Sequence, residues 1–384
     1  MLSSGYVPGI CLKLRPETTS VNEYKRLKKY HQFIKFNREL KASGLRNLKK
    51  HEVILFWLRS NLTRNQFLIL SGILVGCTSG LAGIALKMLV HYIHYVITYK
   101  VRFEDQVVFY AIFPFLGIVL TTLVVIFIFR GQDRKGIPAI LYEIARNSSL
   151  VASVKMYSQI IQSAITVGLG GSAGLESPMA VTGAAIGSNY ARTYRLDYKE
   201  RTLLLAAGAT AGIASAFNAP IAGMMFAFEI LLTGVVFSDF IPLVVAAVCG
   251  SLLSKIILNE DILFQFYARD VFNYKNIPYY LVLGVCSGLY ARYFVIISQK
   301  TEHFFKSLRW SRIRKAMLGG AILSLLCVAL PPLFGEGYQV IKELADGKAE
   351  SILALSFLKY LPYRSWYILL MLGLICVFKA FATP

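Results

Sequence analysis

The sequence predicts an all-α polytopic membrane protein with inverted repeats and with helices that break at membrane depth. Of its 384 residues, 56% are hydrophobic, which excludes a disordered chain and favours a membrane protein. Several of the apolar stretches are interrupted by glycine and proline, which membrane depth allows only where protein or a water-filled cavity surrounds the backbone. The stretches lie near residues 66–99, 106–130, 151–190, 202–258, 279–299, 315–334 and 364–383.

Positive charge is concentrated before the first apolar stretch. Residues 1–65 hold fourteen Lys or Arg against four acids, about half of the formal net charge of +20. The positive-inside rule therefore predicts a basic cytoplasmic N-terminal segment over 1–65. We expect this segment to contact anionic lipid headgroups and not nucleic acid.

A repeated sequence motif divides the rest of the chain into two parts. The pattern GxxSGL occurs at Gly76–Leu81 and again at Gly284–Leu289, and each copy is followed by a further apolar span and a polar break. The breaks are Arg134–Pro138 and Gly335–Tyr338, and a short amphipathic stretch follows each. Repeated halves with broken helices are typical of transporters.

These repeats set the expected boundaries. We predict a first membrane repeat over 66–260, a linker over 261–278 and a partial second membrane repeat over 279–384. From Ser153 to Gly174 is 21 residues, and the same count from Arg364 reaches position 385. The second repeat is therefore expected to stop before its counterpart of the loop at Gly174.

A single acid marks the candidate site. Glu176 is the only charged residue between Lys155 and Arg192, and an acid at membrane depth costs roughly 3 kcal/mol. The preceding glycines, Gly174 among them, allow close approach of backbone to a ligand, and Pro178 fits the first turn of a new helix. A helix that begins there directs unpaired N–H groups at an anion, and the carboxylate can occupy that position until protonation releases it.

A second run, from Leu203 to Glu229, is rich in glycine and alanine and contains Asn218-Ala-Pro220. Its small residues predict close helix packing in lipid, and Asn218-Ala-Pro220 predicts that one helix ends and another begins. Taken alone, this run is most simply a packing surface.

Three runs together carry a resemblance to a known family. They are Lys135-Gly-Ile-Pro138, Gly171-Ser-Ala-Gly-Leu-Glu-Ser-Pro178 and Ala216-Phe-Asn-Ala-Pro-Ile-Ala-Gly-x-x-Phe-x-x-Glu229. In this order and spacing they resemble the CLC family of chloride channels and chloride/proton antiporters, over roughly residues 66–384. The resemblance implies an inverted-repeat CLC-like fold and chloride transport by a channel or a Cl⁻/H⁺ antiporter.

The resemblance also implies roles for the loop around the acid. Glu176 is the expected gating glutamate, which blocks the extracellular side of the anion pathway and carries protons in antiporters. Gly174, Leu175, Ser177 and Pro178 are expected to contribute to anion binding. A bound chloride ion, a homodimer and a multi-pass location in the cell membrane, of the bacterial inner-membrane type, are implied as well.

The second implied anion-binding run departs from the family pattern. Gly136, Ile137 and Pro138 match the family, but Lys135 stands where relatives have a serine. The amides of the following helix remain expected ligands. Lys135 either adds a cation to the site or extends into the cytoplasmic vestibule, and both alternatives stay open.

Proton coupling is undecided by the sequence. Where antiporters often carry an inner glutamate, this chain has Glu229 followed by Ile230, so both are candidate positions on an inner proton path. The family's second-repeat G-x-F-x-P loop and its late tyrosine would both lie beyond Pro384. The competing hypothesis is therefore a truncated, non-conducting fragment or subunit.

An enzyme is not expected. Gly170-Gly-Ser-Ala-Gly174 fits the G-x-S-x-G pattern of hydrolases around Ser172, but no buried strand pattern precedes it. The only histidine downstream is His303. His91 and His94 are spaced like a metal pair without a third ligand, so no metal site is expected.

Overall fold

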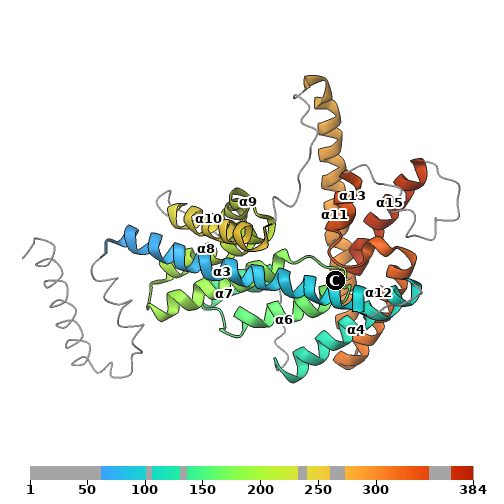
Figure 1. Ribbon diagram of the computed structural model, residues 1–384, viewed down its shortest axis with the longest axis horizontal. Coiled ribbons are helices and arrows are strands. Elements are labelled where there is room, and N and C mark those ends of the chain that lie inside the picture. Colours follow the sequence, from blue (N-terminus) through green and yellow to red (C-terminus); the bar gives the residue numbers. More distant parts are fainter. Residues whose placement is uncertain are drawn as a thin grey trace, which may run out of the picture. The chain divides into compact units, whose positions relative to one another are not determined.

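The computed structural model describes residues 62–100, 106–129, 136–231, 240–259, 273–345 and 365–383. Within these ranges the secondary structure is helical, without a strand, which confirms the all-α prediction (Figure 1). The helices are α3 (Arg64–Tyr95), α4 (Gln106–Phe127), α5 (Gly136–Arg146), α6 (Lys155–Gly168), α7 (Glu176–Thr193), α8 (Tyr198–Phe217), α9 (Pro220–Phe226), α10 (Phe240–Leu258), α11 (Ile277–Ser307), α12 (Arg312–Ala329), α13 (Tyr338–Ala345) and α15 (Ser365–Ala382). Short η segments cover Val96–Lys100, Ala227–Leu231, Tyr274–Asn276 and Pro331–Leu333.

Among the residues that the structure describes, four helical segments are long and apolar enough to cross a membrane: Arg64–Thr98, Val107–Phe127, Phe240–Leu258 and Tyr274–Ser307. At a rise of about 1.5 Å per residue, a helix of about 20 residues spans the hydrocarbon core. Helix α8 ends at a break before α9, as Asn218-Ala-Pro220 predicts. Most of the N-terminal segment over 1–65 and of the linker over 261–278 lies outside the described residues, and the domain boundaries stay predictions.

The break at Asn218 has the predicted form. Helix α8 ends at Phe217, Asn218 adopts a left-handed conformation with φ of 53°, and α9 begins at Pro220. Asn is one of the few residues that accept this conformation, and Pro fits the start of the next helix. Ser251 on α10 donates a hydrogen bond to Asn218 Oδ1 over 2.8 Å, which holds the break in place.

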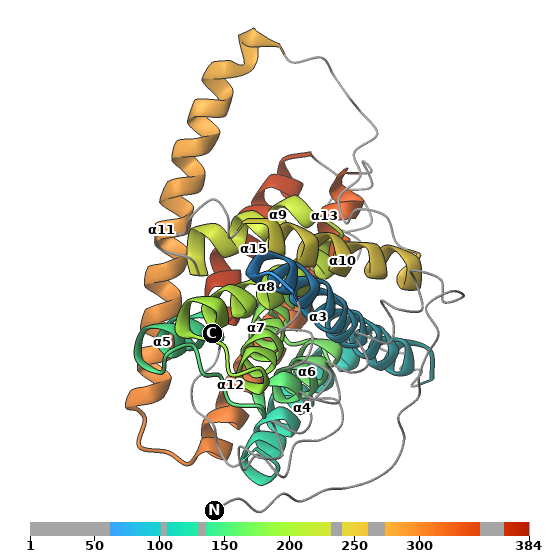
Figure 2. The ribbon, with the colours of Figure 1, turned by 90° about the vertical axis from the view of Figure 1, so that its left-hand side faces the viewer.

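Helices α7 and α8 pack with their backbones nearly touching, and they lie side by side in Figures 1 and 2. A Cβ atom built on Gly208 would lie 2.0 Å from the carbonyl oxygen of Gly183, and one built on Gly187 would lie 1.9 Å from that of Leu204. The prediction of a small-residue face on α8 is therefore confirmed. This packing fixes α7, whose first residue is Glu176.

Helices α4 and α12, which are far apart in the sequence, also pack against each other. Their shared apolar cluster contains Leu323, Cys327 and Leu333, with Tyr110 of α4 packed against it. This contact places the end of α12 and the following loop close to the loop before α7.

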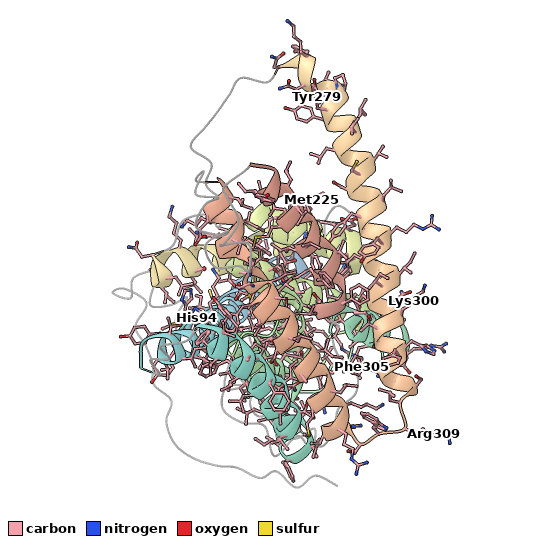
Figure 3. All side chains as sticks on the ribbon, turned by 90° about the vertical axis from the view of Figure 1, so that its right-hand side faces the viewer. His94, Met225, Tyr279, Lys300, Phe305 and Arg309 are labelled. Carbon is pink, nitrogen blue, oxygen red and sulfur yellow. The ribbon has the colours of Figure 1, made fainter. Side chains whose placement is uncertain are left out.

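Helix α11 is different, because none of its residues is buried among the described part of the chain. Figure 3 shows its side chains projecting all round, with Tyr279 near one end and Lys300 further along. Tyr279 is 74% exposed, although the segment Tyr274–Ser307 is one of the four membrane-span candidates.

The contact between α7 and α8 predicts that Gly208→Ala destabilises the protein. The new methyl group would meet a backbone oxygen that cannot move without shifting α7, so we expect the apparent Tm in detergent to fall by about 5 °C or more. Circular dichroism during heating measures this change. Gly284→Ala on α11 is the matched control, because nothing lies within 4 Å of its Cβ position. Equal Tm values for the two variants would contradict the close packing.

Candidate functional site

The loop between α6 and α7 forms the centre of the site. Helix α6 ends at Gly168, and Gly170 has a φ of +94°, a conformation suited to glycine. The N–H of Gly171 donates to the carbonyl of Thr166 over 2.7 Å, so the chain turns back at once. Ser172, which follows, is only 2% exposed. The loop is therefore tightly held before α7 begins.

Glu176 is the first residue of α7, and Pro178 lies in the first turn, as the sequence predicts. The preceding residue, Leu175, provides no side-chain cap for the helix. The carboxylate of Glu176 folds back over Gly174, since a Cβ atom there would lie 1.9 Å from Glu176 Oε2. A negative charge at a helix N-terminus is favoured by the helix dipole and by the unpaired N–H groups.

The start of α5 lies against the start of α7. Gly136 has a φ of +72°, and a Cβ atom on it would lie 3.3 Å from Ser177 Oγ. Ile137 and Pro138 complete the first turn of α5. Two helix N-termini, expected from separate sequence runs, are thus neighbours. Lys135 lies outside the described residues, and both alternatives for its side chain stay open.

A cavity of about 30 Å³ opens beside Glu176, which is enough for a water molecule or a small ion. Helices α3, α7 and α8, the start of α13 and the loop before α13 line it. Its lining consists of Lys87, Leu175, Glu176, Met179, Ala216, Phe217, Glu336 and Tyr338. The sequence interpretation missed Lys87 and Glu336 as neighbours of Glu176.

Residues much later in the sequence hold this loop. The N–H of Gly335 donates to the carbonyl of Gly170 over 3.2 Å. The ring of Phe334 covers Gly170, where a Cβ atom would lie 2.0 Å from it. Lys379 Nζ on α15 donates to Ser172 Oγ over 2.8 Å. Lys379 was also missed, yet it is the only charged residue in α15, and an isolated charge in an apolar helix is a signal of function.

Glu229 and Ile230 are not brought to this cavity. They lie in the η2 segment, Ala227–Leu231, which continues α9. Glu229 is exposed and Ile230 is partly buried, and neither lines the cavity. Their assignment to an inner proton path stays a prediction.

Neither the G-x-S-x-G pattern around Ser172 nor the pair of His91 and His94 has the surroundings of a catalytic or metal site among the described residues. Ser172 follows helix α6 and a short loop, without the strand that precedes a hydrolase nucleophile, and its hydroxyl accepts the hydrogen bond from Lys379. His94 lies next to Phe334, with ring centroids 6.1 Å apart. Within the described ranges, no three His, Cys, Asp or Glu side chains form a group that could hold a metal ion.

The loop geometry predicts that two glycine substitutions with similar backbone strain differ in their effect on thermal stability. Gly170→Ala and Gly335→Ala both place a methyl group at positive φ, which costs roughly 1 kcal/mol or more. Only Gly170→Ala also collides with Phe334, whereas Gly335 has open space. We therefore expect a lower apparent Tm for Gly170→Ala than for Gly335→Ala, by a thermal scan in detergent. A reversed order would contradict the described contact.

The chain is similar to proteins that are described as chloride channels. A family model described as "Voltage gated chloride channel" matches residues 117–383. A putative ClcB-like chloride channel protein of Ralstonia nicotianae is 28% identical over 232 residues, 59% of this chain and 54% of that protein. The voltage-gated ClC-type chloride channel ClcB of Salmonella typhi is 30% identical over 184 residues, 47% of this chain and 44% of that protein. The chain thus spans about half the length of these two relatives.

Solved structures show the same fold. The crystal structure of a slow cyanobacterial Cl⁻/H⁺ antiporter matches with a TM-score of 0.67 at 18% identity, covering 84% of this chain and 75% of that one. A CLC-type fluoride/proton antiporter matches with a TM-score of 0.65 at 22% identity, covering 82% and 75% respectively. These likenesses confirm a CLC-type arrangement of helices.

Proposed function

Because the chain belongs to the CLC family of voltage-gated chloride channels, we propose that it moves chloride or a similar monovalent anion across the membrane. The observation that carries this proposal is the carboxylate of Glu176, folded back at the start of α7 beside a small cavity. The bacterial relatives described as chloride channels and the antiporter structures support it.

In the proposed mechanism, backbone amides at helix starts replace part of the hydration shell of the anion. Gly136 and Ile137 contribute from α5, and Ser177 contributes from α7. Pro138 and Pro178 have no N–H group, and they serve by fixing the first turn of each helix. A bound chloride ion would rest between these two helix starts.

Glu176 acts as the gate. When ionised, its carboxylate competes with the anion for the same amides, because both carry negative charge. When protonated, it loses that attraction and leaves the position to the anion. Gly174 and Leu175 are the last two residues of the loop before Glu176. Leu175 is 4% exposed, and its burial fixes the backbone next to the gate. Whether protons are also carried inward through Glu229 or past Ile230 distinguishes an antiporter from a channel.

We also propose a multi-pass protein of a bacterial inner membrane with its N-terminus in the cytoplasm. Basic residues concentrated in 1–65 support this orientation and contact with anionic lipid. The functional unit would be a homodimer, as the family resemblance implies. Lys135 would either face the anion or extend into the cytoplasmic vestibule.

If Glu176 is the gate, we expect Glu176→Gln to abolish the pH dependence of anion flux while the flux itself persists. Gln has a similar shape but cannot ionise, so the pathway no longer closes at high pH. The test is chloride efflux from liposomes as a function of pH, with the protein produced from its complete gene. Proton uptake recorded in the same vesicles would report coupling and should be lost in the variant.

Glu302→Gln on α11 is the matched control, because this acid is surface-exposed and pairs with Lys306 over 2.6 Å, away from the cavity lining. It should keep the pH profile of the unaltered protein. If Glu176→Gln had the same pH dependence of chloride efflux as the unaltered protein, Glu176 would not be the gate.

A further inference from the structure

Lys87 is an isolated charge in an apolar helix. Helix α3 runs from Arg64 to Tyr95, and after Arg64 its only Lys, Arg, Asp or Glu residue is Lys87. A charged side chain within a membrane span is unfavourable unless it pairs, reaches water or serves a function. The surroundings of Lys87 should therefore indicate what its charge does.

The side chain of Lys87 reaches the cavity beside the candidate gate. Lys87 is the residue that α3 contributes to the lining, and Glu176 belongs to the same lining at the start of α7. Lys87 is partly buried, so solvent screens its charge less than that of a fully exposed lysine. An ion in the cavity would therefore experience this charge at short range.

The position of Lys87 along α3 indicates which side of the membrane the cavity faces. Lys87 lies 23 positions after Arg64. This separation corresponds to about 35 Å along the helix, whereas the hydrocarbon core is about 30 Å thick. Lys87 therefore lies toward the side opposite to the basic N-terminal segment. With the N-terminus in the cytoplasm, as proposed above, this is the extracellular side.

The charges of the lining determine when an anion can enter. Of the described residues that line the cavity, three carry a charge: Lys87, Glu176 and Glu336. While Glu176 is ionised, their formal sum is one negative charge, which repels an anion. Once Glu176 is neutral, Lys87 balances Glu336, and an entering anion meets a cation. Without Lys87, the charge of Glu336 would make the cavity negative in both states.

We propose that Lys87 forms an outer anion-binding site, in which a small monovalent anion from the extracellular side binds before it passes Glu176. The cavity of about 30 Å³ has room for one such ion. The ammonium group of Lys87 attracts the anion, and the starts of α5 and α7 receive it when Glu176 leaves. This inference rests on the proposed function and on the proposed orientation.

A purely structural role for Lys87 would be to balance Glu336, and it differs measurably from anion capture. Loss of a structural partner would lower stability or the maximal rate of transport from both sides of the membrane. Loss of capture would instead raise the chloride concentration that gives the half-maximal rate, and only for chloride added on the extracellular side. Sided transport measurements therefore separate the two roles.

The experiment measures uptake of radioactive chloride, at one pH, into vesicles of cells that produce the protein from its complete gene. Right-side-out vesicles present the extracellular face to the added chloride, and inside-out vesicles present the cytoplasmic face. Lys87→Met removes the charge but keeps much of the side-chain length. In right-side-out vesicles we expect about a fivefold higher half-saturating chloride concentration with an unchanged maximal rate. In inside-out vesicles both values should stay unchanged.

Further variants test whether charge is responsible. Lys87→Arg should retain the half-saturating concentration, and Glu336→Gln should lower it in right-side-out vesicles, because the opposing charge is lost. Added sodium gluconate should narrow the difference between Lys87→Met and the unaltered protein, since salt screens the attraction. Lys199→Met is the matched control, because Lys199 is exposed and lies about 25 Å along α8 from Ala216 in the cavity lining. It should not change uptake in right-side-out vesicles.

The outcomes distinguish the outer site from the proposed function. If the unaltered protein takes up no more chloride than vesicles without it, the proposed function fails. If the unaltered protein transports chloride and Lys87→Met has the same half-saturating concentration in right-side-out vesicles, the outer site is wrong and the function stands. An effect in both vesicle types, in inside-out vesicles alone or on the maximal rate alone also overturns the outer site. If Lys87→Met does not fold, Glu336→Gln decides: a lower half-saturating concentration supports the proposal, and an equal or higher one overturns it.

Discussion

Backbone N–H groups at a helix start need an acceptor, and inside an apolar layer few acceptors exist. The region around α7 is organised by this constraint. Glu176 supplies a carboxylate from the first residue of the helix itself, folded back over Gly174. Gly136, at the start of α5, lies next to Ser177, so the starts of α5 and α7 are neighbours. A negatively charged side chain of α7 itself therefore lies at the start of this helix.

The positions of these helix starts depend on packing further away. Helix α7 is fixed by its backbone contact with α8, where Gly183 and Gly208 leave no room for a side chain. Helix α5 is fixed by a buried ion pair, because Glu143 meets Lys155 at the start of α6 over 3.3 Å. Removing either partner of such a pair would leave an unpaired buried charge, which is strongly unfavourable. Close packing and one buried pair therefore place both helix starts together.

Sequence reasoning found the parts of the site that depend on local signals. Proline in a first turn indicated the starts of α7 and α9, and Asn218 indicated the end of α8. These are short-range preferences of the backbone, so they can be read from neighbouring residues. The glycines and alanines of α8 likewise predicted its close packing.

The same reasoning missed the contacts between residues that are far apart in the sequence. Lys379 is 207 positions from Ser172, and no local pattern indicates that the two meet. Glu336 was noted as part of a polar break, but its place beside Glu176 depends on how α12 and α13 are packed. Lone charges in apolar segments could have been selected as candidates from sequence, although their partners could not.

The loop before α7 is held by residues that lie far from it in the sequence. Glu176 follows this loop, while Phe334 and Gly335 cover and bind it. Lys379 Nζ of α15 adds a third contact, because it donates to Ser172 Oγ in the same loop over 2.8 Å. The position of Glu176 thus depends on α15 and on the loop before α13, as well as on α7 itself.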